Sequence, residues 1–312
     1  MKNNNNVITY NQSNHKIITN NNSNYKVITH KTSIYKIITY YIVITFSLPV
    51  FALTFHSELK DGKLIYGTVD KNEEIFIKSQ YLNLKNNTNN LHQISTTSDG
   101  QFVIGIPQDA KELKITIKTP THSKEKTFKV TPNKWKEEVV NGLPPSKITP
   151  NQKDSERIIQ EALLLKTARE KSENTYFPIS WKRPVSNFKR ISSAFGSRRI
   201  LNGIKKQGHS GVDYAAPTGT PITSPADGKV VLTHPDMFYS GKTILIDHGY
   251  GVFSSYSHLN EINIKENQTV KQGELIGKVG TTGRSTGPHL HFTVTWFGVR
   301  INPEDLFITP KQ

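Results

Sequence analysis

Two histidines near the end of the chain, His289 and His291, are the residues whose type and spacing most clearly indicate chemistry. In a β-strand, residues i and i+2 point to the same face of the sheet. The residues that follow them, Phe292, Val294 and Trp296, favour such an extended segment. Imidazole is the commonest metal ligand and titrates close to neutrality. The pair can therefore bind a metal, act beside one, or divide these two tasks.

Two further clusters lie earlier in the chain. His209 and Asp213 are four residues apart in a segment whose glycines allow a tight turn, and His258 follows an apolar-rich stretch. His, Asp and His are suitable zinc ligands, and a catalytic zinc site uses three protein ligands and a water molecule. The chain has no cysteine, which excludes thiolate ligands, disulfides and a cysteine nucleophile.

Residues 191–305 resemble the lysostaphin/LytM-type zinc metallopeptidases, which cut peptide cross-links of bacterial peptidoglycan. The resemblance rests on three motifs that occur in the family's order: Gly208-His209-Ser210-Gly211-Val212-Asp213, Tyr256-Ser257-His258-Leu259 and Gly287-Pro288-His289-Leu290-His291. It implies one zinc ion bound by His209, Asp213 and His291. It further implies that His258 and His289 form a catalytic pair that does not bind the metal.

This division of roles is chemically coherent. Zinc lowers the pKa of bound water to near neutrality and polarises a scissile carbonyl. One imidazole can take the water proton, and a protonated one can stabilise the oxyanion or protonate the leaving amine. The chain has no His-Glu-x-x-His motif, so histidines must replace the usual glutamate base. Either His258 or His289 can be that base.

Several nearby residues have simpler explanations. We interpret His248 as a structural histidine at a strand end and His234 as a loop residue. Tyr256 could either contribute to the cleft or pack beneath it. Three arginines could bind substrate carboxylates or be ordinary surface residues: Arg198, Arg199 and Arg284.

The sequence predicts a mainly β protein. Residues 53–145 read as a small β-sandwich-like accessory domain, in which residues 113–118 alternate apolar and polar side chains. Residues 146–186 form a linker with a helix predicted over 155–171. Residues 187–312 are expected to form the metallopeptidase domain, an antiparallel β-sheet with an active-site groove, as the resemblance implies.

Residues 1–52 read as a low-complexity leader followed by a signal peptide. The motif Ile/Val-Ile-Thr recurs every ten residues, and we expect a disordered leader rather than a repeat array, because units this polar bury little. The apolar run 37–52 ends in Val50-Phe51-Ala52, which predicts cleavage after Ala52 and export to the periplasm or cell envelope. The run is short for a membrane span, so a retained anchor over residues 37–52 is the minor alternative.

The net charge of +15 indicates an anionic partner. A nucleic-acid-binding motif is missing, whereas the stem peptides of peptidoglycan carry free carboxylates.

We expect cleavage of D-alanyl–diaminopimelate cross-links by a monomer whose N-terminal domain could contact an envelope or membrane protein. The alternatives are a D,D-carboxypeptidase and a non-catalytic LytM-like regulator of cell-wall hydrolases. A regulator usually lacks ligand residues, which are all present here. A sugar-transport phosphocarrier is a further alternative, but such a protein would be cytosolic and would not need Asp213.

Overall fold

The structure is a computed structural model, and it is mainly β, as predicted. It divides into two compact units, residues 1–48 and 49–312. The residues that it describes are 8–11, 16–21, 24–29, 52–78, 91–140, 151–170, 172, 176–177, 180–201, 203–205 and 208–307.

The first unit contains three strands where the sequence led us to expect a disordered leader. The strands β1 (Ile8–Asn11), β2 (Lys16–Asn21) and β3 (Asn24–Thr29) form an antiparallel sheet. The ten-residue spacing aligns the repeats, so that Ile17 lies opposite Ile28, and β-branched residues favour extended backbone. The expectation of disorder is therefore wrong for these residues. Most of the predicted signal peptide, residues 37–51, lies outside the described residues.

The accessory part of the second unit has two small sheets. One has the order β4-β5-β8, and the other has the order β10-β9-β6-β7. Their bounds are β4 (Thr54–Phe55), β5 (Leu64–Thr68), β6 (Glu74–Lys78), β7 (Leu91–Ile94), β8 (Gln101–Gly105), β9 (Glu112–Lys118) and β10 (Ser123–Lys129). The alternation predicted over residues 113–118 is realised, since Leu113, Ile115 and Ile117 are buried.

The helix α2 (Gln152–Arg169) begins three residues before the predicted start, because the Asn151 side chain accepts a hydrogen bond from the Asp154 N–H at 2.8 Å and caps it. Leu165 and Ala168 pack on a cluster of Leu232, Met237, Leu245 and Phe253.

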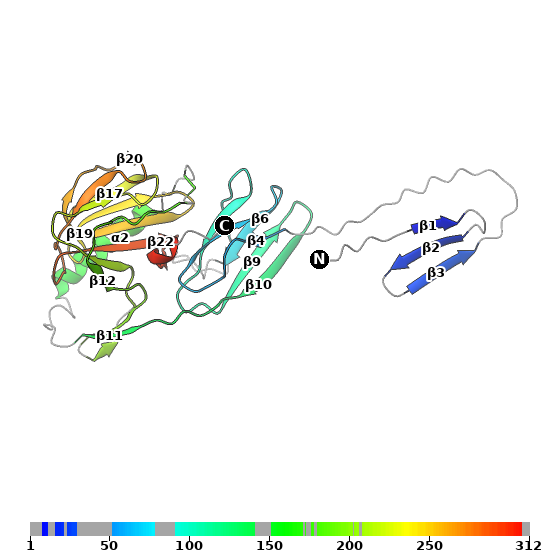
Figure 1. Cartoon of the computed structure of the whole chain (residues 1–312), viewed down its shortest axis with the longest axis horizontal. Helices are drawn as coiled ribbons and strands as arrows, with labels where there is room; N and C mark the ends of the chain where they lie inside the picture. The colour runs from blue at the N-terminus through cyan, green and yellow to red at the C-terminus, as the bar shows by residue number, and fades with distance from the viewer. Residues whose placement is uncertain are drawn as a thin grey trace. The chain divides into compact units, whose positions relative to one another are not determined.

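The C-terminal part is built on a large antiparallel sheet of order β12-β15-β22-β19-β18-β17-β20, against which α2 lies (Figure 1). Its strands are β12 (Arg190–Ser193), β15 (Val212–Ala215), β16 (Pro221–Thr223), β17 (Gly228–Met237), β18 (Gly241–Asp247), β19 (Val252–Ile262), β20 (Thr269–Val270), β21 (Leu275–Val279), β22 (His289–Trp296) and β23 (Val299–Ile301). The 3-10 helix η2 (Pro303–Leu306) follows. The core beneath β19 and β22 contains the fully buried rings of Tyr256, Phe292 and Trp296.

A third small sheet joins the two parts of the second unit. In it, β11 (Glu137–Val140) pairs in parallel with β13 (Arg198–Leu201), which pairs with β14 (Ile204–Lys205). Direct packing adds to this connection. A Cβ added to Gly105 of β8 would lie 2.8 Å from atoms of Trp296 and Ile301, so the backbone of the accessory part closely approaches the large sheet. One hydrophobic cluster runs through both parts.

Candidate metal centre and active site

Four neighbouring strands place the site. Ser193 of β12 lies opposite Asp213 of β15, which lies opposite His291 of β22, which lies opposite Ser257 of β19. Residues that are directly opposite in an antiparallel pair share one face of the sheet. The Asp213 and His291 side chains therefore project together, and His289 projects from the same face two residues earlier, as the spacing predicted.

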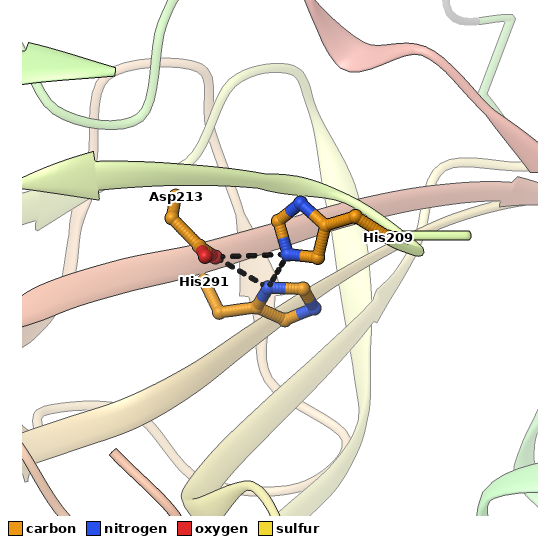
Figure 2. A group of neighbouring side chains, drawn as sticks. All are labelled: His209, Asp213 and His291. Carbon is orange, nitrogen blue, oxygen red and sulfur yellow. Dashed lines mark hydrogen bonds and ion pairs between the residues drawn. The ribbon is translucent and has the colours of Figure 1, made fainter. Parts of the chain in front are cut away.

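The predicted ligands meet at one point (Figure 2). His291 Nδ1 lies 2.7 Å from Asp213 Oδ1, and His209 Nε2 lies 3.2 Å from the same oxygen and 3.1 Å from His291 Nδ1. The ligand atoms of these three residues all lie within 4.8 Å of one another. His209 comes from the segment before β15, where its N–H and C=O bond to the turn at residues 194–197. The sequence predicted this group of three.

In both His209 and His291, the ring nitrogen that faces away from the ligand group contacts a residue outside the group. His209 Nδ1 lies 3.0 Å from the Ala194 carbonyl oxygen, which can only accept a hydrogen bond, so Nδ1 carries the proton. His291 Nε2 lies 3.0 Å from Thr293 Oγ1 and 3.3 Å from Ser210 Oγ. Such outer contacts orient histidine ligands toward a metal. Two imidazole nitrogens and one carboxylate oxygen thus form a donor set that suits zinc.

His258 reaches the site through an unusual backbone conformation. Ser257 shares the face of His291, so the next residue of a regular strand would point away from the site. His258 has a φ of 63°, in the left-handed region, and the register of β19 shifts against β18 across residues 256–259 and against β21 just after them. Its ring returns to the site, with its centroid 4.7 Å from that of His289 and 6.1 Å from that of His291. Positive φ at a non-glycine residue is a form of strain that clusters at functional sites.

The rings of His258 and His289 are also oriented by contacts of Nδ1 with backbone carbonyls. His258 Nδ1 lies 2.8 Å from the Thr282 carbonyl oxygen, and His289 Nδ1 lies 2.8 Å from that of Gly287. Each Nδ1 must therefore carry a proton and donate it, which leaves Nε2 as the basic nitrogen. His289 Nε2 is 3.9 Å from Asp213 Oδ1, so it faces the ligand group.

The protonation states suit these roles. Burial alone would raise the pKa of the Asp213 carboxyl group, but the hydrogen bonds with His209 and His291 hold that pKa well below its ordinary value. Burial lowers the pKa of His291 and lowers the pKa of His258 to about 4. At neutral pH the carboxylate is therefore ionised and these two imidazoles are neutral, so they can bind a cation or accept a proton.

A close backbone approach holds the loop that anchors His258. Gly241 has a φ of 62°, and a Cβ added there would lie 2.3 Å from Thr282 Oγ1 and 2.4 Å from the Thr282 carbonyl carbon. We expect Gly241→Ala to displace the Thr282 carbonyl from His258 and to lower turnover at unchanged metal affinity. Gly219→Ala is the matched control, because Gly219 has a φ of 88° with no atom within 4 Å of the added Cβ. Both variants carry the left-handed backbone cost of about 1–2 kcal/mol, so equal turnover in the two would contradict this role of the loop.

The other residues considered from the sequence lie outside the ligand group. His248 is structural, as interpreted: it is fully buried, with Nδ1 2.7 Å from the Asp227 carbonyl oxygen and Nε2 2.7 Å from Ser254 Oγ. Tyr256 packs beneath the sheet with its hydroxyl 2.7 Å from the same serine oxygen. The loop assignment of His234 is wrong, because His234 belongs to β17, which continues through a register shift that accommodates Pro235.

The arginines are described in part. Arg198 forms an exposed ion pair with Asp109 at 3.0 Å. The Arg284 guanidinium lies over the Tyr239 ring, 3.9 Å from its centroid. The side chain of Arg199 lies outside the described residues. The residues that support the site were not predicted, because their roles depend on contacts between distant segments: Ser193, Ala194, Thr282 and Thr293.

The buried His248 predicts a pH dependence of stability. Burial lowers its pKa to about 4 in the folded chain, whereas the unfolded histidine titrates near 6.5. The unfolded state therefore binds more protons between these values, and stability falls as the pH falls from about 6.5 to 4, by about 3 kcal/mol. Denaturant unfolding of the metal-free protein should show this loss, and His248→Gln should reduce it. An equal slope for the two proteins would refute the assignment.

The comparisons with known proteins agree with this site. Residues 207–303 match the model of Peptidase family M23, a span that contains all five predicted site residues. Residues 207–303 therefore form an M23 peptidase domain, which confirms the resemblance of this part of the chain to the LytM-type peptidases.

Among curated proteins, the chain is 43% identical over 122 residues to the peptidoglycan DD-endopeptidase ShyA of Vibrio cholerae, covering 38% of this chain and 28% of ShyA. It is 44% identical over 127 residues to the DD-carboxypeptidase/endopeptidase Mpg of Neisseria meningitidis, covering 40% of this chain and 29% of Mpg. The matches thus span less than a third of each relative's length.

A solved structure extends the likeness beyond the matched domain. The crystal structure of a putative peptidase M23 from Pseudomonas aeruginosa aligns with a TM-score of 0.60 at 28% identity. The alignment covers 80% of this chain and 96% of that one. The accessory part and the peptidase part together therefore resemble a single solved chain.

Proposed function

We propose that this protein is an exported zinc metalloendopeptidase that hydrolyses peptide cross-links of peptidoglycan. The observation that carries the proposal is the convergence of His209, Asp213 and His291 within 4.8 Å. The rings of His258 and His289 lie beside this group. A metal ligand group with two adjacent non-ligand imidazoles can supply both the Lewis acid and the general acid and base that metal-assisted peptide hydrolysis uses.

Zinc held by His209, Asp213 and His291 would lower the pKa of water to near neutrality and polarise the scissile carbonyl. The protein's own contribution is to move protons. His258 and His289 both have Nδ1 committed to a carbonyl, so Nε2 is the atom that exchanges protons with the reactants. One neutral imidazole takes the proton of the attacking water. The other, once protonated, stabilises the oxyanion or protonates the leaving amine.

The names of the relatives support a specific bond. ShyA is a DD-endopeptidase, and Mpg carries both DD-carboxypeptidase and endopeptidase in its name. We propose that this chain cuts the D-alanyl–diaminopimelate cross-link. Removal of a terminal D-alanine is the second candidate, which the double name of Mpg favours, because both reactions need the same activated water.

The test is digestion of purified cross-linked muropeptides by the full chain, with products identified by mass. Endopeptidase activity should convert dimers to monomers, whereas carboxypeptidase activity should release D-alanine from monomers that still carry it. Conversion should stop when a chelator is added. If protein with one zinc per chain converted neither substrate, the alternative of a non-catalytic regulator would replace the proposal.

Export is part of the proposal and is supported by the sequence of residues 37–52. In the parts of the chain that the structure describes, no helix is both long and apolar enough to cross a membrane. Sequencing the N-terminus of the native protein should give Leu53 as the first residue. A mature chain that begins near Met1 would contradict cleavage. The monomeric state and an envelope partner for the N-terminal part stay predictions.

A further inference from the structure

A carboxylate from outside the peptidase motifs approaches the predicted ligand His209. Glu138 lies on β11, in the segment that precedes the linker helix. Its carboxylate oxygens are 3.1 and 3.4 Å from Ser193 Oγ. Ser193 Oγ is in turn 3.2 Å from His209 Nδ1. Glu138 is thus connected to the ligand by a single hydroxyl group.

The hydrogen bonds in this chain have one consistent direction. The Ala194 carbonyl requires that His209 Nδ1 carry a proton, and the same N–H can be shared with Ser193 Oγ as a second acceptor. An ionised carboxylate can only accept, so the serine hydroxyl donates to Glu138. Ser193 is only 8% exposed and Glu138 is half-buried, so this contact is partly shielded from water. Charge-assisted hydrogen bonds of this kind are the stronger ones.

Other contacts fix the same corner of the peptidase. Gly196, in the turn after Ser193, donates its N–H to the His209 carbonyl at 2.9 Å. The Trp135 indole packs against Gly196 so closely that an added Cβ would lie 2.3 Å from a ring carbon. Gln108 of the accessory part donates its side-chain amide to the Gly196 carbonyl at 3.3 Å. The backbone around His209 is therefore supported by residues that precede the predicted peptidase domain.

We propose that Glu138, acting through Ser193, is a positioning residue for His209. It gives the Nδ1–H that the Ala194 carbonyl already requires a second acceptor polarised by the carboxylate, helps to direct Nε2 toward Asp213 and His291, and increases the basicity of Nε2 as a ligand. The inference rests on the proposed zinc site and adds that the segment before the linker completes it. Loss of such an outer partner typically reduces metal affinity by about 10–100-fold.

The test measures zinc affinity of the full chain by competition with a chromophoric chelator, together with thermal unfolding of the metal-free protein. Glu138→Ala and Ser193→Ala should each weaken zinc binding by about tenfold or more. The double variant should be no weaker than either single variant, because both interrupt the same connection. Glu138→Gln, which keeps an acceptor and loses the charge, should fall between Glu138→Ala and the wild type. Glu137→Gln is the matched control, since Glu137 is the exposed neighbour on the same strand, and it should bind zinc as the wild type does.

The outcomes separate this inference from the proposed function. If the wild type binds no zinc, the proposed function fails. If the wild type binds zinc tightly and Glu138→Ala binds it equally well, only this inference is overturned. A lower unfolding temperature of metal-free Glu138→Ala at unchanged zinc affinity would assign Glu138 a purely structural role and would also overturn it.

Discussion

The His291→Ala variant is expected to lose both zinc binding and muropeptide hydrolysis. His291 offers Nδ1 to the ligand group at 2.7 Å from Asp213 Oδ1, so its removal leaves two of the three ligands. Because loss of an outer partner of a ligand already costs about 10–100-fold in metal affinity, loss of a ligand should cost more than about 100-fold. Equilibrium dialysis with metal analysis measures the affinity, and muropeptide digestion measures the activity.

The control is His234→Ala, which removes a histidine from β17, outside the ligand group. This variant should bind one zinc per chain and retain turnover. Thermal unfolding of both metal-free variants will show whether the fold is intact. Zinc binding by folded His291→Ala with wild-type affinity would remove His291 from the ligand set.

The His289→Ala variant should separate binding from turnover. His289 Nε2 faces Asp213 at 3.9 Å, beyond the distances within the ligand group, and its Nδ1 is held by the Gly287 carbonyl. We expect wild-type zinc content and a fall in turnover of about 10²–10⁴-fold, the range for loss of a positioned acid or base. Zinc analysis and initial rates on the same preparation measure both quantities.

His258→Ala provides the parallel experiment, because the two rings lie 4.7 Å apart and we assign both to proton transfer. It should also keep zinc and lose turnover. Full activity of His289→Ala would show that the roles of the neighbouring histidines are divided incorrectly. Loss of zinc from His289→Ala would instead make it a fourth ligand.

The strands around the site were predictable because their patterns are local. Alternation of side chains places His289 and His291 on one face of a strand, and the same rule correctly identifies the buried apolar residues of β9. The family motifs then bring His209, Asp213 and His258 together with them. Strand pairing in the structure explains this: Asp213 and His291 are direct cross-strand partners.

Local patterns failed where distant contacts decide the outcome. The interpretation of His234 as a loop residue was wrong, because the pairing of β17 with β18 extends past it through an irregular register. Alternation alone would place His258 on the face away from His291, and only its positive φ reverses this. The contact between Glu138 and Ser193 joins residues 55 positions apart, and neither residue lies in a recognisable motif.

Zinc titration of the chelator-treated full chain tests the central claim most directly. Cross-linked muropeptide is supplied in excess, and the rate of cleavage is recorded as zinc is added in known equivalents. We predict no cleavage before zinc is added, a rate that rises in proportion to zinc, and a plateau at one equivalent per chain. Cleavage by fully metal-free protein, or no cleavage by protein that has bound one zinc per chain, would contradict the assignment of this site as a zinc peptidase.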